Sequence, residues 1–331
     1  MHSDSVKTDP TDVPPVPKVR VVFMGTPTFA GDILSGILDR GYNVVAVYTR
    51  HDKPAGRKRE IVPSAVKQIA IDRKIPVEQP VRFDENAVAR LRSYEPDLVI
   101  VAAYGRILPQ DVLDMPGFGC VNVHASMLPR WRGASPVQNA LLCGDTETGV
   151  TVMLMDEGVD TGPILSQVSL VIDDGDTTES LLKRMSEDGL RLLDGVIPRW
   201  IEKRITPREQ CGSDATLCEL IEREDGRIFW NDTAIAILNR YRGLHPWPGI
   251  FTFWRREEGL LRLKLTKISI QKSDPSVERK FGEVFEMGEN VAVRTGLGVV
   301  FIEEIQPEGK APMPIRDFLN GRPEFIGAIL G

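Results

Sequence analysis

The chain has 331 residues, of which 42% are hydrophobic and 27% are charged, as is typical of a folded protein with two domains or one large one. Its formal net charge of −6 argues against a generally basic nucleic-acid coat protein, so any site for a polyanion must be local. The longest apolar stretch, Leu98–Ala103, is far shorter than the ~20 residues of a membrane-spanning helix.

The first residues of the chain show neither the apolar core of a secretory signal nor the Arg-rich amphipathic pattern of a transit peptide. We therefore expect residues 1–17 to be a disordered extension and the protein to be cytoplasmic. The cysteines fit a reducing compartment, because no two are spaced as CxxC and they form no zinc-ligand cluster. They are Cys120, Cys143, Cys211 and Cys218.

The first structured elements alternate between strand and helix patterns. Lys18–Met24 is a β-rich run, Phe29–Asp39 has a helical pattern, and Val44–Tyr48 is a second apolar strand. Thr26 stands where it could cap the helix, followed by Pro27 in the first turn. This order predicts an α/β fold with a mostly parallel, Rossmann-like sheet.

The same alternation continues to residue 205, so residues 18–205 are predicted to form one α/β domain. We expect helices near Ser64–Lys74, Glu85–Tyr94, Ser135–Leu142 and Thr178–Lys203, and strands at Asp97–Ala103, Cys120–His124, Val150–Met155 and Ile164–Ile172.

The composition and the periodicity of the sequence change after Ile205. Residues 206–224 are polar and weakly periodic, which predicts a linker. A helix at Thr233–Arg242 and several short strands then predict a small β-barrel or sandwich over 225–331, and of the two we expect the smaller, OB-like β-barrel domain. The strands are Ile250–Trp254, Leu261–Ile270, Gly282–Met287, Val291–Arg294 and Val299–Ile305. This part has 15 basic and 14 acidic residues, against 26 and 33 in the rest of the chain.

Two polar residues at the end of a predicted strand are the first candidates for chemistry. Asn122 and His124 lie on one face of the strand because side chains alternate, while Val121 and Val123 lie on the other. Ligands of α/β proteins bind at the carboxyl ends of such strands. An edge strand with a solvated polar face is the alternative, but the apolar neighbours favour a site.

A second candidate is the acidic, glycine-containing segment Met155–Gly162, which predicts a tight loop between two strands. One of its carboxylates could approach a histidine at the neighbouring strand end. Most loops of this composition are plain turns, so the pattern by itself leaves both interpretations open.

A third candidate is the basic run Arg50–Arg59, with five Lys or Arg in ten residues. Such a run is usually a solvated face. Here it directly follows the carboxyl end of a predicted strand, so it should lie near the expected site.

Several motifs occur together in this chain: Asn122-Val-His124-Ala-Ser126-Met-Leu-Pro129, Arg130-Trp-Arg-Gly-Ala-Ser-Pro136, Gly149-Val-Thr151 and Gly158-Val-Asp160-Thr-Gly162. In this combination the chain resembles the folate-dependent formyltransferases, over nearly its whole length from Lys18. The Asp52-Lys-Pro-Ala-Gly-Arg57 insert and the added C-terminal domain resemble the branch that acts on initiator tRNA.

The resemblance implies transfer of a formyl group from 10-formyltetrahydrofolate to the α-amino group of methionine on initiator tRNA, by a monomer and without a metal. It implies that Asn122, His124 and Asp160 are catalytic. Attack of an amine on the formyl carbon creates an oxyanion, to which the Asn122 amide and a protonated His124 can donate. Asp160, if close, would hold the His124 ring and favour its charged form.

The resemblance also implies two binding segments. Ser126, Met127, Leu128 and Pro129 match the segment that contacts folate, although the family usually has Leu at the position of Met127. The tRNA-contacting loop is matched by Lys53, Arg57, Lys58 and Arg59, with Arg57 as the discriminating residue.

Basic residues on the predicted C-terminal strands also suit a tRNA backbone, although nearby glutamates make a mixed-charge surface an equal alternative. They are Arg255, Arg256, Arg262, Lys264 and Lys267. We predict that Trp247 and Trp254 belong to the core.

Two other functions stay open. One is formyl transfer to another amine, such as a nucleotide sugar or glycinamide ribonucleotide, which the basic insert and the C-terminal domain argue against. The other is a dinucleotide-dependent protein or an inactive folate-binding module. The first strand is not followed by G-x-G-x-x-G, and all three implied catalytic residues are present, so both forms of this alternative are disfavoured.

Overall fold

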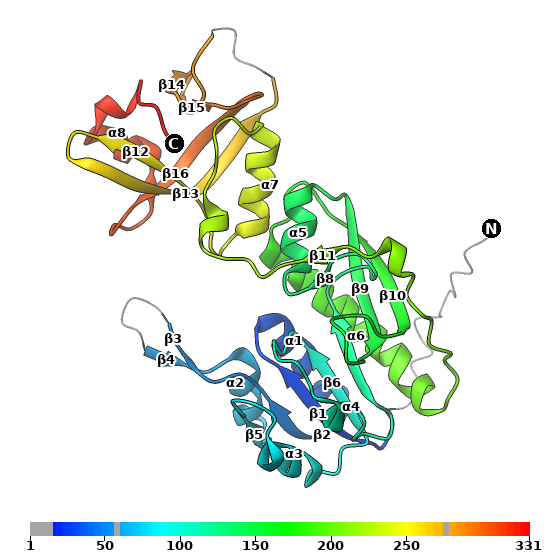
Figure 1. Ribbon diagram of the computed structural model, residues 1–331. Helices are drawn as coiled ribbons and strands as arrows, with labels where there is room; N and C mark the ends of the chain where they lie inside the picture. Colours follow the sequence, from blue (N-terminus) through cyan, green and yellow to red (C-terminus); the bar gives the residue numbers. More distant parts are fainter. Residues whose placement is uncertain (1–15, 56–59, 274–277) are drawn as a thin grey trace. The chain divides into compact units, whose positions relative to one another are not determined.

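The computed structural model describes residues 16–55, 60–273 and 278–331, without the side chains of residues 53–55 and 60 (Figure 1). Residues 1–15 of the expected extension therefore lie outside the described residues. The chain forms two compact units. The first contains the residues up to 134 together with 147–171 and 182–218, and the second contains 135–146, 172–181 and 219–331. Among the described helices, none is both long and apolar enough to cross a membrane.

The first unit is built on a seven-stranded sheet, which confirms the predicted α/β class. Its strands are β1 (Arg20–Gly25), β2 (Asn43–Tyr48), β5 (Val77–Glu78), β6 (Leu98–Ala102), β7 (Cys120–His124), β9 (Glu147–Leu154) and β10 (Ile164–Val171). They lie in the order β10-β9-β7-β6-β1-β2-β5. The pairs from β7 to β5 are parallel, whereas β9 and β10 pair antiparallel.

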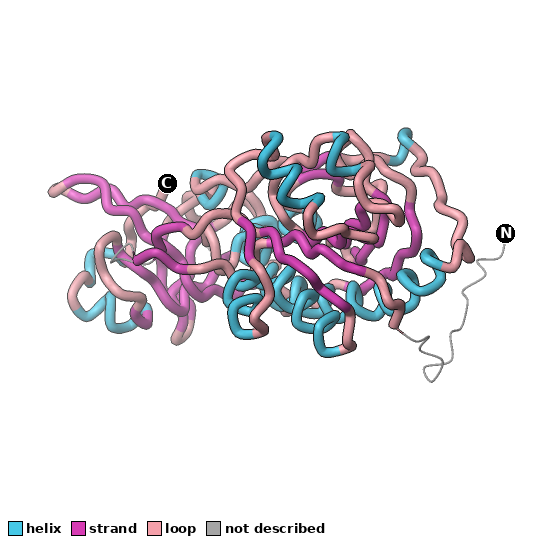
Figure 2. Tube along the Cα trace, turned by 90° about the horizontal axis from the view of Figure 1, so that it is seen from below, coloured by secondary structure: helices cyan, strands magenta, loops and turns pink. Residues whose placement is uncertain are grey.

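Helices cover both faces of this sheet (Figure 2). They are α1 (Thr28–Asp39), α2 (Ala65–Asp72), α3 (Glu85–Arg92), α4 (Gln110–Leu113) and α6 (Thr178–Ile201), whose first turn belongs to the second unit. Leu91 of α3 and Val112 of α4 share a core cluster with β1, β2 and β6. On the other face α6 packs closely on β7, since a Cβ at Gly189 would lie 2.9 Å from Val123 Cγ1.

Two local predictions were wrong. Helix α1 begins at Thr28 after Pro27, and Thr26 does not cap it. The Thr26 hydroxyl instead donates to Tyr104 O at 3.2 Å and accepts from Arg50 N at 3.4 Å, so it ties together the segments that follow β1, β6 and β2. Trp254 is buried as predicted, but Trp247 is 58% exposed, because it lies in a proline-rich turn outside the core.

The second unit is a closed antiparallel β-domain, as the predicted fold class requires. Its sheet has the order β12-β13-β16-β15-β14, with β17 beside β16. Residues Ile329 and Leu330 bridge Glu283 and Trp254, which links the two ends of that order. The elements are α5 (Pro136–Cys143), α7 (Ala234–Leu244), β12 (Ile250–Arg256), β13 (Gly259–Gln271), β14 (Val284–Met287), β15 (Asn290–Arg294), β16 (Val299–Pro307), β17 (Met313–Pro314) and α8 (Ile315–Asn320).

Candidate active site

Strand β7 holds Asn122 and His124 inside the first unit, where they are 8% and 7% exposed. The strand is paired on both sides, with β6 and with β9, so the alternative of a solvated edge strand is wrong. Val123 faces α6. Asn122 and His124 therefore point away from that helix, because alternate side chains of a strand take opposite faces.

The Asp160 carboxylate meets both of these side chains. Its Oδ1 lies 3.4 Å from Asn122 Nδ2 and 3.5 Å from His124 Nδ1, while its Oδ2 accepts a 2.8 Å hydrogen bond from Gly133 N. The loop that carries Asp160 is thus more than a plain turn. Asp160 has φ of 55°, a left-handed conformation that residues with a Cβ seldom adopt. Such strain is concentrated at functional positions, so it adds weight to this site.

The His124 ring is held at both nitrogens. Nε2 lies 3.1 Å from the carbonyl oxygen of Trp131, and since a carbonyl only accepts, Nε2 carries a proton here. Nδ1 faces the Asp160 carboxylate. A second proton on Nδ1 would turn that contact into an ion pair.

The predicted folate segment, Ser126 to Pro129, forms a turn fastened to β9 and β10. Thr151 Oγ1 donates to Ser126 O at 2.7 Å and accepts from Leu128 N at 3.1 Å. Gln167 Nε2 donates to Leu128 O at 2.8 Å, and Ser126 Oγ donates to Arg130 O at 2.6 Å. Four hydrogen bonds therefore hold this turn close to His124. Sequence reasoning overlooked Gln167, whose strand position carries no signal for this role.

Met127 of the same turn packs on Gly149 of β9. A Cβ at Gly149 would lie 2.5 Å from Met127 Sδ and 2.1 Å from the backbone oxygen of Val168. Only glycine fits here without movement of the turn, which gives the Gly-Val-Thr motif a packing reason.

Part of the segment predicted as a linker is bound to the loops of the site. Strand β11 (Leu217–Cys218) pairs in parallel with β8 (Arg132–Gly133), and Arg208 forms an antiparallel bridge with Ile164. We call residues 208–218 the strap. Its Gln210 contacts the main chain of Asp160, a role that its polar, aperiodic sequence did not indicate.

The basic insert begins with an anchored carboxylate. Lys67 Nζ lies 2.5 Å from Asp52 Oδ2, and Gln79 Nε2 donates to Asp52 Oδ1 at 3.0 Å. These two hydrogen bonds hold the pKa of Asp52 below its ordinary value of 3.8. Strands β3 (Lys53–Ala55) and β4 (Glu60–Val62) then pair as a hairpin. Arg57, Lys58 and Arg59 lie outside the described residues, as does the Lys53 side chain.

Several of the predicted C-terminal tRNA contacts interact with their own unit. Lys267 pairs with Glu303 at 3.0 Å and Arg256 with Glu258 at 3.4 Å. The Arg262 guanidinium lies 3.6 Å from the centre of the Phe251 ring, and burial lowers the pKa of Lys264. Arg255 is exposed. This is a surface of mixed charge, and a tRNA role for it stays a prediction.

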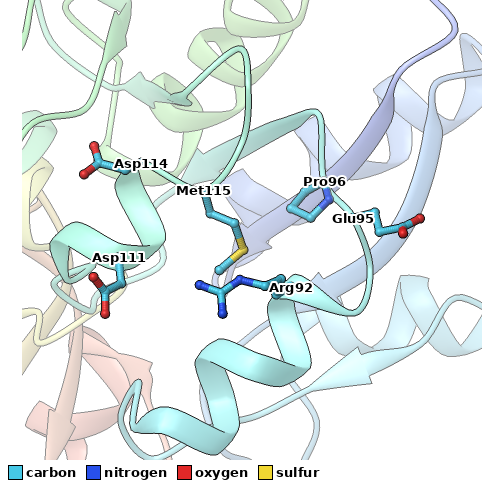
Figure 3. A pocket seen from close by; sticks show the side chains of 6 residues that line it. All are labelled: Arg92, Glu95, Pro96, Asp111, Asp114 and Met115. Atoms are coloured by element: carbon cyan, nitrogen blue, oxygen red, sulfur yellow. The ribbon is translucent and has the colours of Figure 1, made fainter.

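A pocket of about 480 Å³ lies elsewhere in the first unit, near α3 and α4 (Figure 3). Three carboxylates and one guanidinium line it, so its charge disfavours an anionic ligand such as folate. The lining residues are Arg92, Glu95, Pro96, Asp111, Asp114 and Met115.

Comparison with known proteins gives a consistent result for both units. A family model described as formyl transferase matches residues 18–197, and one described as formyl transferase, C-terminal domain, matches residues 220–323. The chain belongs to the formyl transferase family. Its relatives include methionyl-tRNA formyltransferases from Methylococcus capsulatus, 43% identical over 91% of this chain and 96% of that protein, and from Citrifermentans bemidjiense, 40% identical over 95% and 96%.

Solved structures of low identity share the fold of this family member. HypX from Aquifex aeolicus in complex with tetrahydrofolic acid has a TM-score of 0.64 and 18% identity, covering 93% of this chain and 47% of that one. Methionyl-tRNA formyltransferase from Clostridium thermocellum has a TM-score of 0.53 and 19% identity, covering 77% and 95%.

Replacing Gly149 by Ala should destabilise the protein by roughly 1–3 kcal/mol, because the new methyl overlaps Met127 and a backbone oxygen. Urea unfolding of the variant would measure this. Gly175→Ala is the matched control, since a Cβ there meets nothing within 4 Å. Equal losses for the two variants would contradict the packing role of Gly149.

Asp52→Asn should lower the free energy of unfolding at pH 7 by up to ~1 kcal/mol. The effect is small because the Asp52–Lys67 ion pair still reaches solvent, each side chain being 22% exposed, and water screens its charges. The folded-state pKa of Asp52 is lowered, so its contribution is present above about pH 3.8 and disappears as the pH falls through the folded-state value. Unfolding curves from pH 7 to pH 2 should therefore converge for the two proteins. A difference as large at pH 2 as at pH 7 would contradict this account.

Proposed function

We propose that this protein transfers the formyl group of 10-formyltetrahydrofolate to the α-amino group of methionine esterified to initiator tRNA. The product is N-formylmethionyl-tRNA, used in the initiation of translation. The observation that carries the proposal is the convergence of the Asp160 carboxylate on Asn122 and His124, in a member of the formyl transferase family. Its methionyl-tRNA formyltransferase relatives match over more than 90% of this chain, which favours tRNA over a small acceptor. We expect it to act as a cytoplasmic monomer.

The reaction begins when the lone pair of the neutral amine attacks the formyl carbon. The carbonyl π electrons move to oxygen, and the oxyanion is stabilised by N–H donors. The Asn122 amide has a second N–H besides the one facing Asp160, and the oxyanion competes with Trp131 O for the His124 Nε2 proton. The bond from the formyl carbon to N10 of the folate then breaks.

The reaction moves one proton from the amine to the folate, and Asp160 can take part in this transfer. The amine loses one proton as the new C–N bond forms, and N10 gains one as it leaves. The Asp160 carboxylate favours a proton on His124 Nδ1. It can also accept the amine proton through water and return it, again through water, to the leaving N10, which balances the exchange. The leaving nitrogen of an N-formyl folate is already a good one, so this chemistry needs no metal.

Substrate binding follows from the neighbouring segments. The folate segment begins one residue after the end of β7, so a folate bound along this turn would present its formyl group to His124. The segment consists of Ser126, Met127, Leu128 and Pro129. Lys53, Arg57, Lys58 and Arg59 belong to the insert after β2. Their charges would contact phosphates of the acceptor stem, which positions the methionine end.

His124→Ala should lower kcat for formyl transfer to Met-tRNA by ~10²–10³-fold, because one donor to the oxyanion is lost. Folate affinity should change little. The assay compares Met-charged initiator tRNA with glycinamide ribonucleotide and an amino sugar nucleotide, each with 10-formyltetrahydrofolate. Near-full turnover of His124→Ala would contradict the mechanism, whereas transfer to a small amine alone would contradict the proposed acceptor.

Arg57→Ala should weaken transfer to Met-tRNA and reduce the slope of log KM against log salt by ~0.7–0.9, the value for one lost phosphate contact. A guanidinium can fork onto a phosphate, so Arg57→Lys should restore only part of the loss. Folate KM should stay constant. Arg73→Ala is the matched control, because Arg73 is an exposed arginine at the C-cap of α2. Identical salt slopes for wild type and Arg57→Ala would show that the insert is only a solvated surface.

A further inference from the structure

The side-chain amide of Gln210 joins two loops of the site through four hydrogen bonds. Nε2 donates to Asp160 O at 2.9 Å and to Gly162 O at 2.7 Å. Oε1 accepts from Arg132 Nε at 3.1 Å and from Arg132 Nη2 at 2.7 Å. A glutamine amide has two N–H donors and two lone pairs on oxygen, so its whole capacity is used. The orientation of the amide is also fixed, because a flipped Oε1 would face two carbonyl oxygens.

These contacts close a ring around Asp160. The Asp160 carboxylate accepts from Gly133 N, and the Asp160 carbonyl is bound by Gln210, which is itself held by Arg132, the neighbour of Gly133. Asp160 is thus fixed at its main chain and at its side chain by one turn. Its left-handed backbone is strained, and these hydrogen bonds offset that strain.

The strap presents Gln210 from a fixed backbone. Arg208 N donates to Ile164 O at 2.9 Å, and Ile164 N donates to Arg208 O at 2.8 Å. Beyond Gln210, Thr216 O accepts from Arg132 N at 2.9 Å, and Thr216 Oγ1 accepts from Trp131 N at 2.9 Å. The strap therefore binds the start of β10 before Gln210 and the Arg132 turn after it, and Gln210 bridges the Asp160 loop and that turn.

We infer that Gln210 is a positioning residue that aims the Asp160 carboxylate at Asn122 and His124. The inference rests on the proposed formyl transfer. Gln210 contacts the main chain of Asp160 and acts through it, so its loss should change the geometry of the reacting step more than the binding of either substrate.

The first test replaces Gln210 by Met, which keeps the length of the side chain but removes the amide, and by Glu, which sets a carboxylate against two carbonyl oxygens. We expect kcat for Met-tRNA formylation to fall ~10–100-fold in both, with the KM of folate and of Met-tRNA within about threefold of wild type. Gln306→Met is the matched control, because Gln306 is half-buried and donates to a backbone carbonyl in the second unit. Wild-type kcat in Gln210→Met would overturn the inference.

The second test separates positioning from a general structural role. In an Asp160→Ala background, Gln210→Met should reduce kcat less than twofold further, because residues that act as one unit are non-additive. Full, multiplicative losses would overturn the inference. If Gln210→Met does not fold, Gln210→Asn retains the amide one methylene short and takes its place in the cycle.

The third test does not depend on activity. The ¹⁵N chemical shifts of the His124 imidazole report its contact with Asp160, and they should change in Gln210→Met but not in Gln306→Met. Unchanged shifts in both would overturn the inference. Failure of the proposed function looks different: the wild type would not formylate Met-tRNA, while the shift change in Gln210→Met would still occur.

Discussion

The contact of one carboxylate with a buried polar pair is the constraint on which the first unit depends. Asp160 reaches Asn122 and His124 from a loop 38 residues beyond Asn122 in the chain. That reach requires β9 to run antiparallel beside β7, so that the segment after β9 returns to the site. It also requires a left-handed residue at the loop and a close turn after β7. The tight packing of Gly149 and Gly189 keeps those elements in place.

Burial strengthens this contact and also requires that the buried polar groups have hydrogen-bond partners. Asn122 and His124 lose most of their water, so each needs a polar partner within the protein. Asp160 and Trp131 O supply those partners without occupying every N–H donor of the Asn122 amide. The site can therefore be ordered before a substrate arrives and can still donate to an oxyanion, which is the condition for electrostatic preorganisation.

The basic insert after β2 and the basic residues of the second unit differ in what they can offer a polyanion. On the second unit, Lys267 and Arg256 are paired with carboxylates, and Arg262 stacks on Phe251. The charges of Lys267 and Arg256 are therefore already partly neutralised by these carboxylates. In the insert after β2, the structure describes the carboxylate at its start. Asp52 is hydrogen-bonded to Lys67 and Gln79 at the base of the hairpin. This arrangement fixes where the insert begins.

The sequence by itself determined the elements and singled out Asn122 and His124, and the family resemblance added Asp160, which the structure brings to them. Strand β7 and the faces of Asn122 and His124 follow from period-two alternation, and the α/β and β-rich halves follow from local patterns. Only the tertiary structure determined which residues connect these elements through hydrogen bonds. Gln210 bonds residues 50 and 78 positions away, Ile329 and Leu330 complete the β-domain, and Thr26 bonds Tyr104 O instead of capping α1. Hydrogen bonds between distant segments leave no periodic pattern in the sequence. Each needs only one polar residue on a segment, and the fold determines which residue of another segment becomes its partner.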